Sequence, residues 1–398
     1  MSKKKMMNAD QFRAYVNSDL IIKDFNRCLY ERNIEYDEYF SLLNDYLASP
    51  DSFILCGDST EGHKRNNVIT IYHMLANSYP PINDKEPFIT FYSCGTSISQ
   101  GDKLGHFDIG INNLVFRIDP GPGSYIGTFD ILKQSSGKIG RDPLWLDGIL
   151  MTHIHNDHTG GFQAIFERMR WNGIKSNKNK FIIANKTCIN GEQQFDCGPI
   201  LDKYKKNIVK NYGLDRGESI FLDGIKFTAT SSKHVESVNN GKFLQDSCIG
   251  FKIETDHLSI GITGDTEWHS DLAKDFQGVD IIIAYIVQES ERAGTSTQKD
   301  YGLNKKIEYH RQFLGEEGVI ELAKQVKPEL GIIITDYGDQ MKSPDGHYHF
   351  IPKIIADRIY QRINGIVPII PAEKGLTIKF IKNKNRYKLR YENNIFRK

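Results

Sequence analysis

The most constraining feature of this sequence is a run of histidines that directly follows an apolar segment. Leu146 to Met151 has the character of a strand, and the run after it reads Thr-His-Ile-His-Asn-Asp-His-Thr-Gly-Gly, residues 152–161. His153 and His155 are two residues apart at the strand end, so their side chains lie on the same side. Asp157 and His158 follow in the turn and can reach a second position close by.

This run predicts a metal site. Metal ligands need lone pairs that converge, and imidazole with carboxylate suits zinc, with iron and manganese as alternatives. The run concentrates three histidines and an aspartate in six residues of a chain that has only 12 histidines, which argues against an incidental histidine-rich turn. Gly160-Gly161 is expected to let the chain turn tightly into the next helix.

Strands and helices are predicted to alternate after Pro87. Helices are expected at 159–171 and 315–327, and strands at 88–92, 114–118, 146–151, 181–184, 225–230, 248–254, 258–262, 280–283 and 330–334. Such alternation favours a layered α/β domain. Residues 1–85 instead have apolar spacing typical of helices, so the chain divides into a helical region, 1–85, and an α/β domain, 86–398. Phe12, Tyr15, Phe25 and Tyr30 are expected to form the helical region's own core.

Composition sets broad limits on partners and location. Charged residues make up 25% of the chain and the net charge is +1, so no overall field gathers nucleic acid or an acidic membrane. The longest apolar runs fall short of the 18 residues that would suggest a membrane span. No signal peptide is recognisable, and the six cysteines include no C-x-x-C pair, so we expect reduced thiols and a cytoplasmic protein.

The H-x-H-x-D-H pattern followed by two glycines resembles the signature of the metallo-β-lactamase superfamily. The resemblance covers roughly residues 88 to 380. It implies a four-layer αββα sandwich with a two-metal site at the sheet edges, preceded here by the small helical region. It also implies a hydrolase in which two divalent ions, zinc foremost, hold a hydroxide between them.

Further residues match elements of the family pattern. Asp119, at the end of the strand 114–118, matches the early aspartate that supports the site from behind. His234 matches the third histidine of the first metal, and Asp265 in Thr-Gly-Asp-Thr matches the bridging aspartate. The resemblance therefore implies a first metal bound by His153, His155 and His234, and a second bound by Asp157, His158 and Asp265.

The sequence departs from the pattern at the last ligand. Where the family has a histidine after a late strand, this chain has Asp336. A carboxylate can also ligate the metal, so Asp336 is expected to complete a harder, more anionic second site that tilts preference toward manganese or iron. His347 and His349 are rivals for the same role.

Two segments are similar to the ribonuclease Z-like branch, which includes cyclic-nucleotide phosphodiesterases. Gly95-Thr96-Ser97 matches its opening loop, and the stretch from His310 to Asp336 matches its closing segment. By that alignment His310 is the candidate general acid, with Glu308 as a residue that could orient it, and Asp157 acts both as ligand and in catalysis.

The function predicted from these features is metal-dependent hydrolysis of a phosphodiester in a nucleotide or nucleic acid. One alternative is hydrolysis of a thioester, lactam or lactone on the same fold. Another is a partner-binding protein whose second metal site is degenerate, for which Asp336 is the one indication.

Two lysine-rich segments and the helical region remain as candidate contact surfaces. Residues 172–212 are interpreted as a basic insertion that includes Lys180, and the five basic residues 382, 384, 386, 388 and 390 would share one face of a strand. Either patch could contact phosphates, although a solvated face balanced by acids is the simpler interpretation. The helical region could bind a protein partner or form a homodimer.

Overall fold

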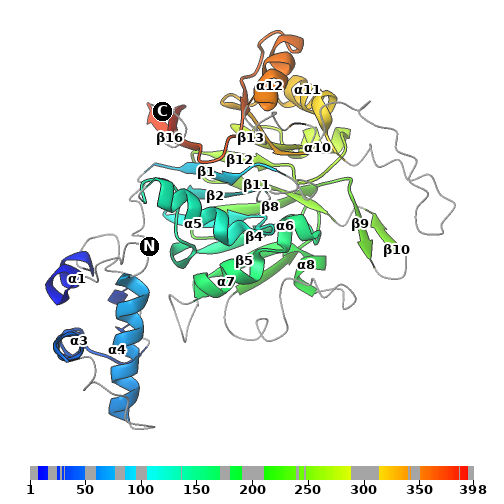
Figure 1. The fold of residues 1–398 in the computed structure, drawn as a ribbon. Helices are drawn as coiled ribbons and strands as arrows, with labels where there is room; N and C mark the ends of the chain where they lie inside the picture. The colour runs from blue at the N-terminus through cyan, green and yellow to red at the C-terminus, as the bar shows by residue number, and fades with distance from the viewer. Residues whose placement is uncertain are drawn as a thin grey trace.

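The computed structural model describes residues 8–16, 25–26, 29–30, 32–49, 60–76, 86–95, 105–135, 137–170, 180–190, 210–238, 242–245, 248–287, 313–338, 341, 350–384 and 386–392. Two large sheets lie face to face, and helices cover the outer face of each (Figure 1). The predicted four-layer αββα sandwich is therefore confirmed.

The first sheet has eight strands, in the order β17-β16-β1-β2-β3-β4-β5-β6. The strands from β3 to the edge strand β6 pair parallel, and the strands from β17 to β3 pair antiparallel. The strands are β1 (Phe88–Ser93), β2 (His106–Ile111), β3 (Leu114–Ile118), β4 (Gly148–Met151), β5 (Phe181–Asn185), β6 (Lys210–Leu214), β16 (Thr377–Asn383) and β17 (Arg386–Glu392).

The second sheet has seven strands, in the order β15-β14-β13-β12-β11-β8-β7. They are β7 (Ser219–Leu222), β8 (Ile225–Ser231), β11 (Ile249–Glu254), β12 (Ser259–Ile262), β13 (Ile281–Val287), β14 (Gly331–Tyr337) and β15 (Ile369–Pro371). A separate pair, β9 (Val235–Val238) and β10 (Lys242–Gln245), projects beside the sandwich (Figure 1).

The main hydrophobic core lies between the two sheets. Phe116 of β3 meets Phe227 of β8 at a ring-centroid distance of 5.4 Å, so the two inner faces interlock directly. All seven residues of β13 and all seven of β14 are buried, because helices cover the other face of that sheet. Strands covered on both faces need continuous apolar runs, which is why Ile281–Ile283 and Ile332–Ile334 stand out in the sequence.

Helices form the two outer layers. On one side α5 (Ser124–Gln134), α6 (Asn156–Thr159), α7 (Phe162–Arg170) and α8 (Lys186–Asn190) cover the first sheet, and a 3-10 turn, η2, spans Pro143–Trp145 (Figure 1). On the other side α10 (Ser270–Asp275), α11 (Gly315–Val326) and α12 (Phe350–Arg362) cover the second sheet.

The amino-terminal helices have an aromatic cluster of their own. These helices are α1 (Ala9–Val16), α3 (Tyr36–Ala48) and α4 (Thr60–Ala76). Phe12 contacts Tyr72 and Tyr39 at centroid distances of 5.1 and 6.2 Å, and Phe25 also packs into the cluster. Leu144 and Trp145 of η2 belong to the same cluster and connect it to the sandwich. Tyr30 was wrongly predicted as core, since 86% of its side chain is exposed.

The predicted basic insertion at 172–212 is partly wrong. Its middle and its end form β5 and β6 of the first sheet. Lys180 is buried, and its Nζ donates to the backbone oxygen of Leu146, so it serves the strand connection and not a surface patch.

The predicted basic strand face at 382–390 is also wrong, because a turn splits it between β16 and β17. Asn383 pairs with Arg386 across that turn. Of the basic residues on β17, Arg386 lies 3.1 Å from Glu329 and Arg390 lies 3.2 Å from Glu392, so acids balance both arginines. In the described part of the chain, no helix is both long and apolar enough to cross a bilayer.

A buried ion pair stabilises the first sheet beneath α5. Arg117 and Asp108 are both fully buried, with Nε to Oδ1 at 2.6 Å and Nη2 to Oδ2 at 3.0 Å. Thr128 accepts from Arg117 Nη1 at 2.6 Å, and the Tyr92 hydroxyl donates to Asp108 Oδ2 at 2.6 Å. These contacts satisfy the charges that burial would otherwise leave without compensation.

We predict that Asp108→Asn lowers the free energy of unfolding by about 3–5 kcal/mol, because Arg117 then stays buried without its counter-charge. Urea denaturation would measure this. The matched control is Lys226→Ala, which removes an exposed partner of Glu254 at 3.9 Å and should cost less than about 1 kcal/mol. An equal loss in both variants would contradict the assignment.

Candidate metal centre

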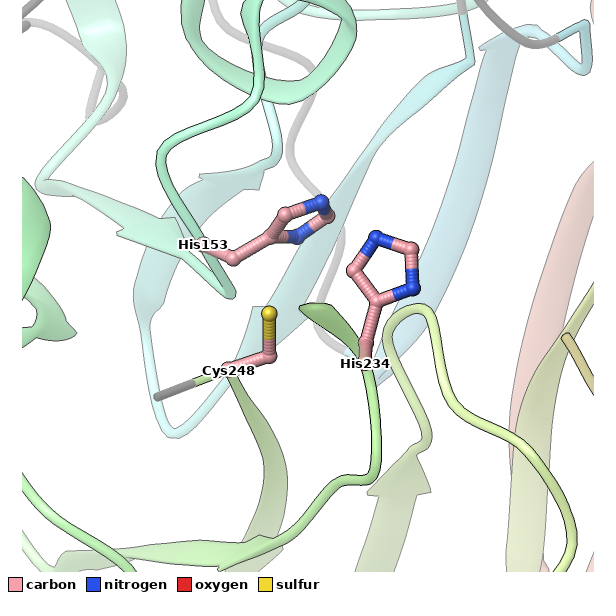
Figure 2. A group of neighbouring side chains, drawn as sticks. All are labelled: His153, His234 and Cys248. Atoms are coloured by element: carbon pink, nitrogen blue, oxygen red, sulfur yellow. The ribbon is translucent and has the colours of Figure 1, made fainter. Parts of the chain in front are cut away.

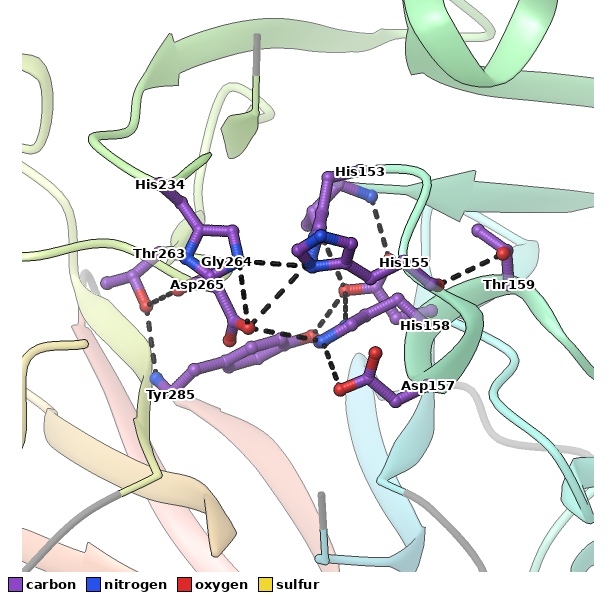
Figure 3. Close-up of polar contacts among 12 residues, drawn as sticks. His153, His155, Asp157, His158, Thr159, His234, Thr263, Gly264, Asp265 and Tyr285 are labelled. Atoms are coloured by element: carbon purple, nitrogen blue, oxygen red, sulfur yellow. Dashed lines mark hydrogen bonds and ion pairs between the residues drawn. The ribbon is translucent and has the colours of Figure 1, made fainter. Parts of the chain in front are cut away.

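Seven predicted ligands gather where strands of both sheets end on the same edge. His153 and His155 follow β4, and Asp157 and His158 lie in the short helix α6. His234 follows β8, Asp265 follows β12, and Asp336 is the next-to-last residue of β14. Figure 3 shows the imidazoles and the Asp265 carboxylate converging from opposite sides.

The first group of ligand atoms has the spacing of a single tetrahedral ion. His155 Nδ1 lies 3.0 Å from His153 Nε2 and 3.1 Å from His234 Nε2. Asp265 Oδ2 lies 3.8 Å from His153 Nε2 and 3.7 Å from His234 Nε2. A tetrahedral zinc ion places its nitrogen ligands about 3.3 Å apart, and these four distances are compatible with that spacing.

A second group adjoins the first and shares Asp265 with it. His158 Nε2 lies 3.4 Å from Asp157 Oδ2 and 3.4 Å from Asp265 Oδ2. His153, His158 and Asp265 are all buried and can direct one ligand atom each to a common point. Asp265 Oδ2 lies within 3.8 Å of ligand atoms in both groups, so it belongs to both.

Three buried polar atoms without hydrogen-bond partners show that the ligand set around Asp265 fits a cation. His158 Nε2, Asp265 Oδ1 and Asp336 Oδ2 are shielded from solvent and have no hydrogen-bond partner in the described structure. Such atoms are costly unless something satisfies them, and divalent metal ions would do so.

The field of the site also favours a cation. Burial raises the pKa of Asp336, and the neighbouring charge of Asp265 raises it further. Burial opposes a charge on His158, but Asp157 and Asp265 outweigh it and raise the pKa of the imidazole. The carboxylates around His158 therefore favour a positive charge beside them.

In the first group, by contrast, the surroundings keep His153 and His155 neutral. Burial lowers the pKa of His153, and the nearby His158, His155 and His234 lower it further. Burial likewise lowers the pKa of His155. Neutral imidazoles keep a lone pair for a metal, which is the state that ligation requires.

Asp119 and Thr152 determine which imidazole nitrogens face the centre. Thr152 donates its N–H to Asp119 Oδ1 at 2.7 Å and its hydroxyl to Asp119 Oδ2 at 2.8 Å. Because the Thr152 hydroxyl hydrogen is used on Asp119, its oxygen accepts a hydrogen bond from His153 Nδ1, which lies 3.0 Å away. The other ring nitrogen of His153, Nε2, then carries the lone pair that can bind a metal. His158 Nδ1 lies 3.2 Å from Asp119 Oδ2, so its Nε2 also faces the centre. Asp119 thus lies behind the site, as expected from sequence.

Asp336 is brought to this edge by an unusual backbone conformation. Its φ is 60°, a left-handed value that aspartate tolerates better than most residues. The next residue, Tyr337, donates its N–H to the backbone oxygen of Cys94 at 2.6 Å, which connects β14 to the end of β1. A Cβ on Gly105 would lie 3.0 Å from Asp336 Oδ1, so the glycine leaves room for that carboxylate.

The second glycine after the histidine run has a steric role. A Cβ on Gly161 would lie 2.1 Å from the backbone oxygen of Gly121, which no side chain could tolerate. The Gly161 N–H donates to the Pro120 oxygen at 2.8 Å, so two loops touch there through their backbones. The predicted tight turn is therefore better explained as a close approach, because Gly160 has an ordinary helical φ of −64°.

Sequence reasoning missed two residues at the centre. Tyr285 of β13 donates its hydroxyl to Asp119 Oδ2 at 3.0 Å, and its ring stacks on His158 at 5.9 Å and 15°. Cys248, buried at the start of β11, points toward His153 and His234, and the three side chains can direct ligand atoms to one another within 4.8 Å (Figure 2). Both residues sit in ordinary strand sequence, so no local motif marks them.

Several predicted site residues lie outside the described part of the chain. They are the candidate general acid His310, its neighbour Glu308, and the rival ligands His347 and His349. Gly95 forms a bridge to Tyr337 beside Asp336, whereas Thr96 and Ser97 also lie outside the described residues.

Comparison with known proteins identifies the family. The family model described as "Beta-lactamase superfamily domain" matches residues 116–334, more than half of the chain. This chain belongs to that superfamily. The match runs from β3 to the end of the apolar part of β14, and so includes six of the seven predicted ligands.

Relatives and solved structures agree with this placement. An uncharacterised protein of Methanocaldococcus jannaschii is 28% identical over 308 residues, which cover 76% of this chain and 98% of that protein. A protein of Herpetosiphon aurantiacus named metal-dependent hydrolase is 32% identical over 132 residues, which cover 32% of this chain but only 47% of that protein.

Solved structures share the fold at low identity. Yeast PDE1 has a TM-score of 0.53 at 13% identity, over 74% of this chain and 100% of that one. The metallo-β-lactamase fold protein YhfI of Bacillus subtilis has a TM-score of 0.51 at 12% identity, over 74% of this chain and 100% of that one. A long-form RNase Z from yeast has a TM-score of 0.52 at 10% identity, over 84% of this chain and 46% of that one.

Family and geometry together make this chain a metal-dependent hydrolase with the metallo-β-lactamase fold. The family model covers the strands that carry the ligands, and groups of buried side chains there are able to hold metal ions.

We predict that His155→Ala lowers the metal bound per chain by about one equivalent, because His155 Nδ1 lies between the other two nitrogens of the first group. Inductively coupled plasma mass spectrometry of the purified proteins measures this. His257→Ala changes an exposed histidine in the turn before β12 and should keep the wild-type metal content. Full metal content in His155→Ala would contradict the first ligand group.

Proposed function

We propose that this chain is a two-metal phosphodiesterase that acts on a nucleotide or nucleic acid. The observation that carries the proposal is the pair of adjoining ligand groups that share Asp265 Oδ2. Divalent ions, when bound, would supply Lewis acidity and bring the pKa of water toward neutrality. Zinc is the foremost candidate, with manganese or iron as alternatives.

The roles of the residues follow from their contacts. His153, His155 and His234 hold the first position through their ring nitrogens, and Asp265 contributes to both positions. Asp157 and His158 hold the second position, and the fixed contact between His158 Nδ1 and Asp119 keeps the ring from turning away. We propose Asp336 as the last ligand of the second position, because its Oδ2 is buried without a partner.

Similarity to named proteins gives further support. Yeast PDE1 and the yeast long-form RNase Z share this fold, and the sequence resembles the ribonuclease Z-like branch in its opening and closing segments. We propose His310 as the general acid that protonates the leaving oxygen, on that resemblance alone. Asp157, which faces the shared centre, is the proposed second catalytic group.

We also propose that residues 1–85 form a region separate from the hydrolase domain, 86–398. Its support is the aromatic cluster of Phe12, Phe25, Tyr39 and Tyr72, which is distinct from the core between the sheets. A protein partner or a second copy of the chain would bind through this region.

We also propose a cytoplasmic location, because the cysteines form no pattern typical of disulfides.

We predict that the metal-loaded chain hydrolyses bis-p-nitrophenyl phosphate and that it turns over nitrocefin and thioesters far more slowly. Release of p-nitrophenolate measures the first activity. His155→Ala should lose most of it, whereas His257→Ala should keep it. Faster turnover of nitrocefin or a thioester would favour the carbonyl hydrolase, and a metal-loaded protein inactive on every substrate would contradict a hydrolase.

We predict that Asp336→His shifts metal preference from manganese toward zinc, on the order of tenfold in the ratio of the two affinities. The physical reason is that a neutral nitrogen replaces a hard anionic oxygen at the second position. Competitive metal titration followed by metal analysis measures the ratio. An unchanged ratio, with both ions still bound, would show that Asp336 is not a ligand.

A further inference from the structure

Tyr285 is a buried residue at the centre whose contacts are not explained by packing alone. It lies on β13 of the second sheet, with 3% of its surface exposed. Its hydroxyl crosses to the first sheet, where it donates to Asp119 Oδ2 at 3.0 Å. Figure 3 shows the ring extending from β13 toward His158.

The Tyr285 ring and hydroxyl act on the same ligand by two routes. The ring stacks on His158 with centroids 5.9 Å apart and planes 15° apart. The hydroxyl contacts the carboxylate oxygen that also faces His158 Nδ1 at 3.2 Å. Two contacts therefore fix the direction in which His158 Nε2 points. The Tyr285 ring lies against one face of the imidazole, and the Asp119 carboxylate contacts its Nδ1.

The backbone of Tyr285 is also fixed relative to Asp265. Its N–H donates to Thr263 Oγ1 at 3.0 Å, and Thr263 lies two residues before Asp265. One residue of β13 therefore connects the loop that carries Asp265 with the carboxylate that orients His158. These are the two ligands whose facing atoms, Nε2 and Oδ2, lie 3.4 Å apart.

We propose that Tyr285 is a positioning residue for the second metal position, acting through Asp119 and the His158 ring. This proposal rests on the two-metal site proposed above but not on the choice of substrate. Without the Tyr285 hydroxyl, Asp119 Oδ2 would keep two donors, the Thr152 hydroxyl and His158 Nδ1. The first position would be affected less, because Thr152, which contacts His153 Nδ1, also donates its backbone N–H to the other oxygen of Asp119, Oδ1.

The test is Tyr285→Phe, which keeps the ring and removes the hydroxyl. The metal-free full-length chain is titrated with Co²⁺, and binding is followed by calorimetry and visible absorption. The expected result is that the first ion binds as in the wild type and the second binds about 10- to 100-fold more weakly. Replacing Tyr285 by 4-aminophenylalanine, which again offers a donor, should restore the second affinity.

The matched control is Tyr92→Phe. Tyr92 is also fully buried and donates to a buried carboxylate, Asp108 Oδ2, at 2.6 Å, but that carboxylate pairs with Arg117. Tyr92→Phe should lower thermal stability by a similar amount and leave both Co²⁺ affinities unchanged. This control separates a general loss of stability from a loss of ligand orientation.

Two Co²⁺ ions bound by Tyr285→Phe with wild-type affinities would overturn the proposal, as would equal weakening in Tyr92→Phe. If Tyr285→Phe does not fold, 4-fluorophenylalanine at this position carries the same test, since it fills the hydroxyl space without a donor. A wild-type chain that binds fewer than two ions would instead contradict the two-metal site itself. Phosphodiesterase activity does not enter any of these outcomes.

Discussion

The arrangement of this centre depends on the carboxylate of Asp119. Its two oxygens contact the backbone and hydroxyl of Thr152, the Nδ1 of His158 and the hydroxyl of Tyr285. Through Thr152 it also determines which nitrogen of His153 keeps its lone pair. A single buried acceptor therefore orients residues of both ligand groups and connects the two sheets. A buried carboxylate that accepts several hydrogen bonds is both well compensated and rigidly held, which is what an orienting group requires.

The sandwich explains why so many polar groups can be buried in one place. Strands of both sheets end on the same edge, so short loops there project side chains into a shared space without disturbing the apolar core between the sheets. Asp119 directly follows β3 and Asp336 is the next-to-last residue of β14, and both have left-handed backbone conformations, with φ of 43° and 60°. The unpartnered atoms on His158, Asp265 and Asp336 are then the expected result of a site built around ions.

Much of the fold could be predicted from local sequence because its strands are buried on both faces. The runs around Ile283 and Ile333 are continuously apolar, which marked β13 and β14 within a few residues. Elements without a strong periodic signal were missed. The strand β2 contains Asp108, and the helix α5 follows a loop of prolines and glycines, so neither matches a simple pattern. The prediction of one basic strand face at 382–390 was wrong, because a pattern of alternating basic residues cannot reveal a turn. The turn here lies between Asn383 and Arg386.

The sequence by itself determined the chemistry of the centre. His153, His155, Asp157 and His158 are neighbours in the chain, so their convergence follows from the geometry of one strand end and one helical turn. The tertiary structure decided what a one-dimensional pattern cannot contain, namely which distant residues face that cluster. Tyr285 reaches Asp119 across 166 positions of sequence, and Cys248 comes to lie beside His153, only because two sheets pack face to face. Contacts across a sheet interface depend on strand order and register, and these are fixed by the whole core and not by the residues that happen to meet.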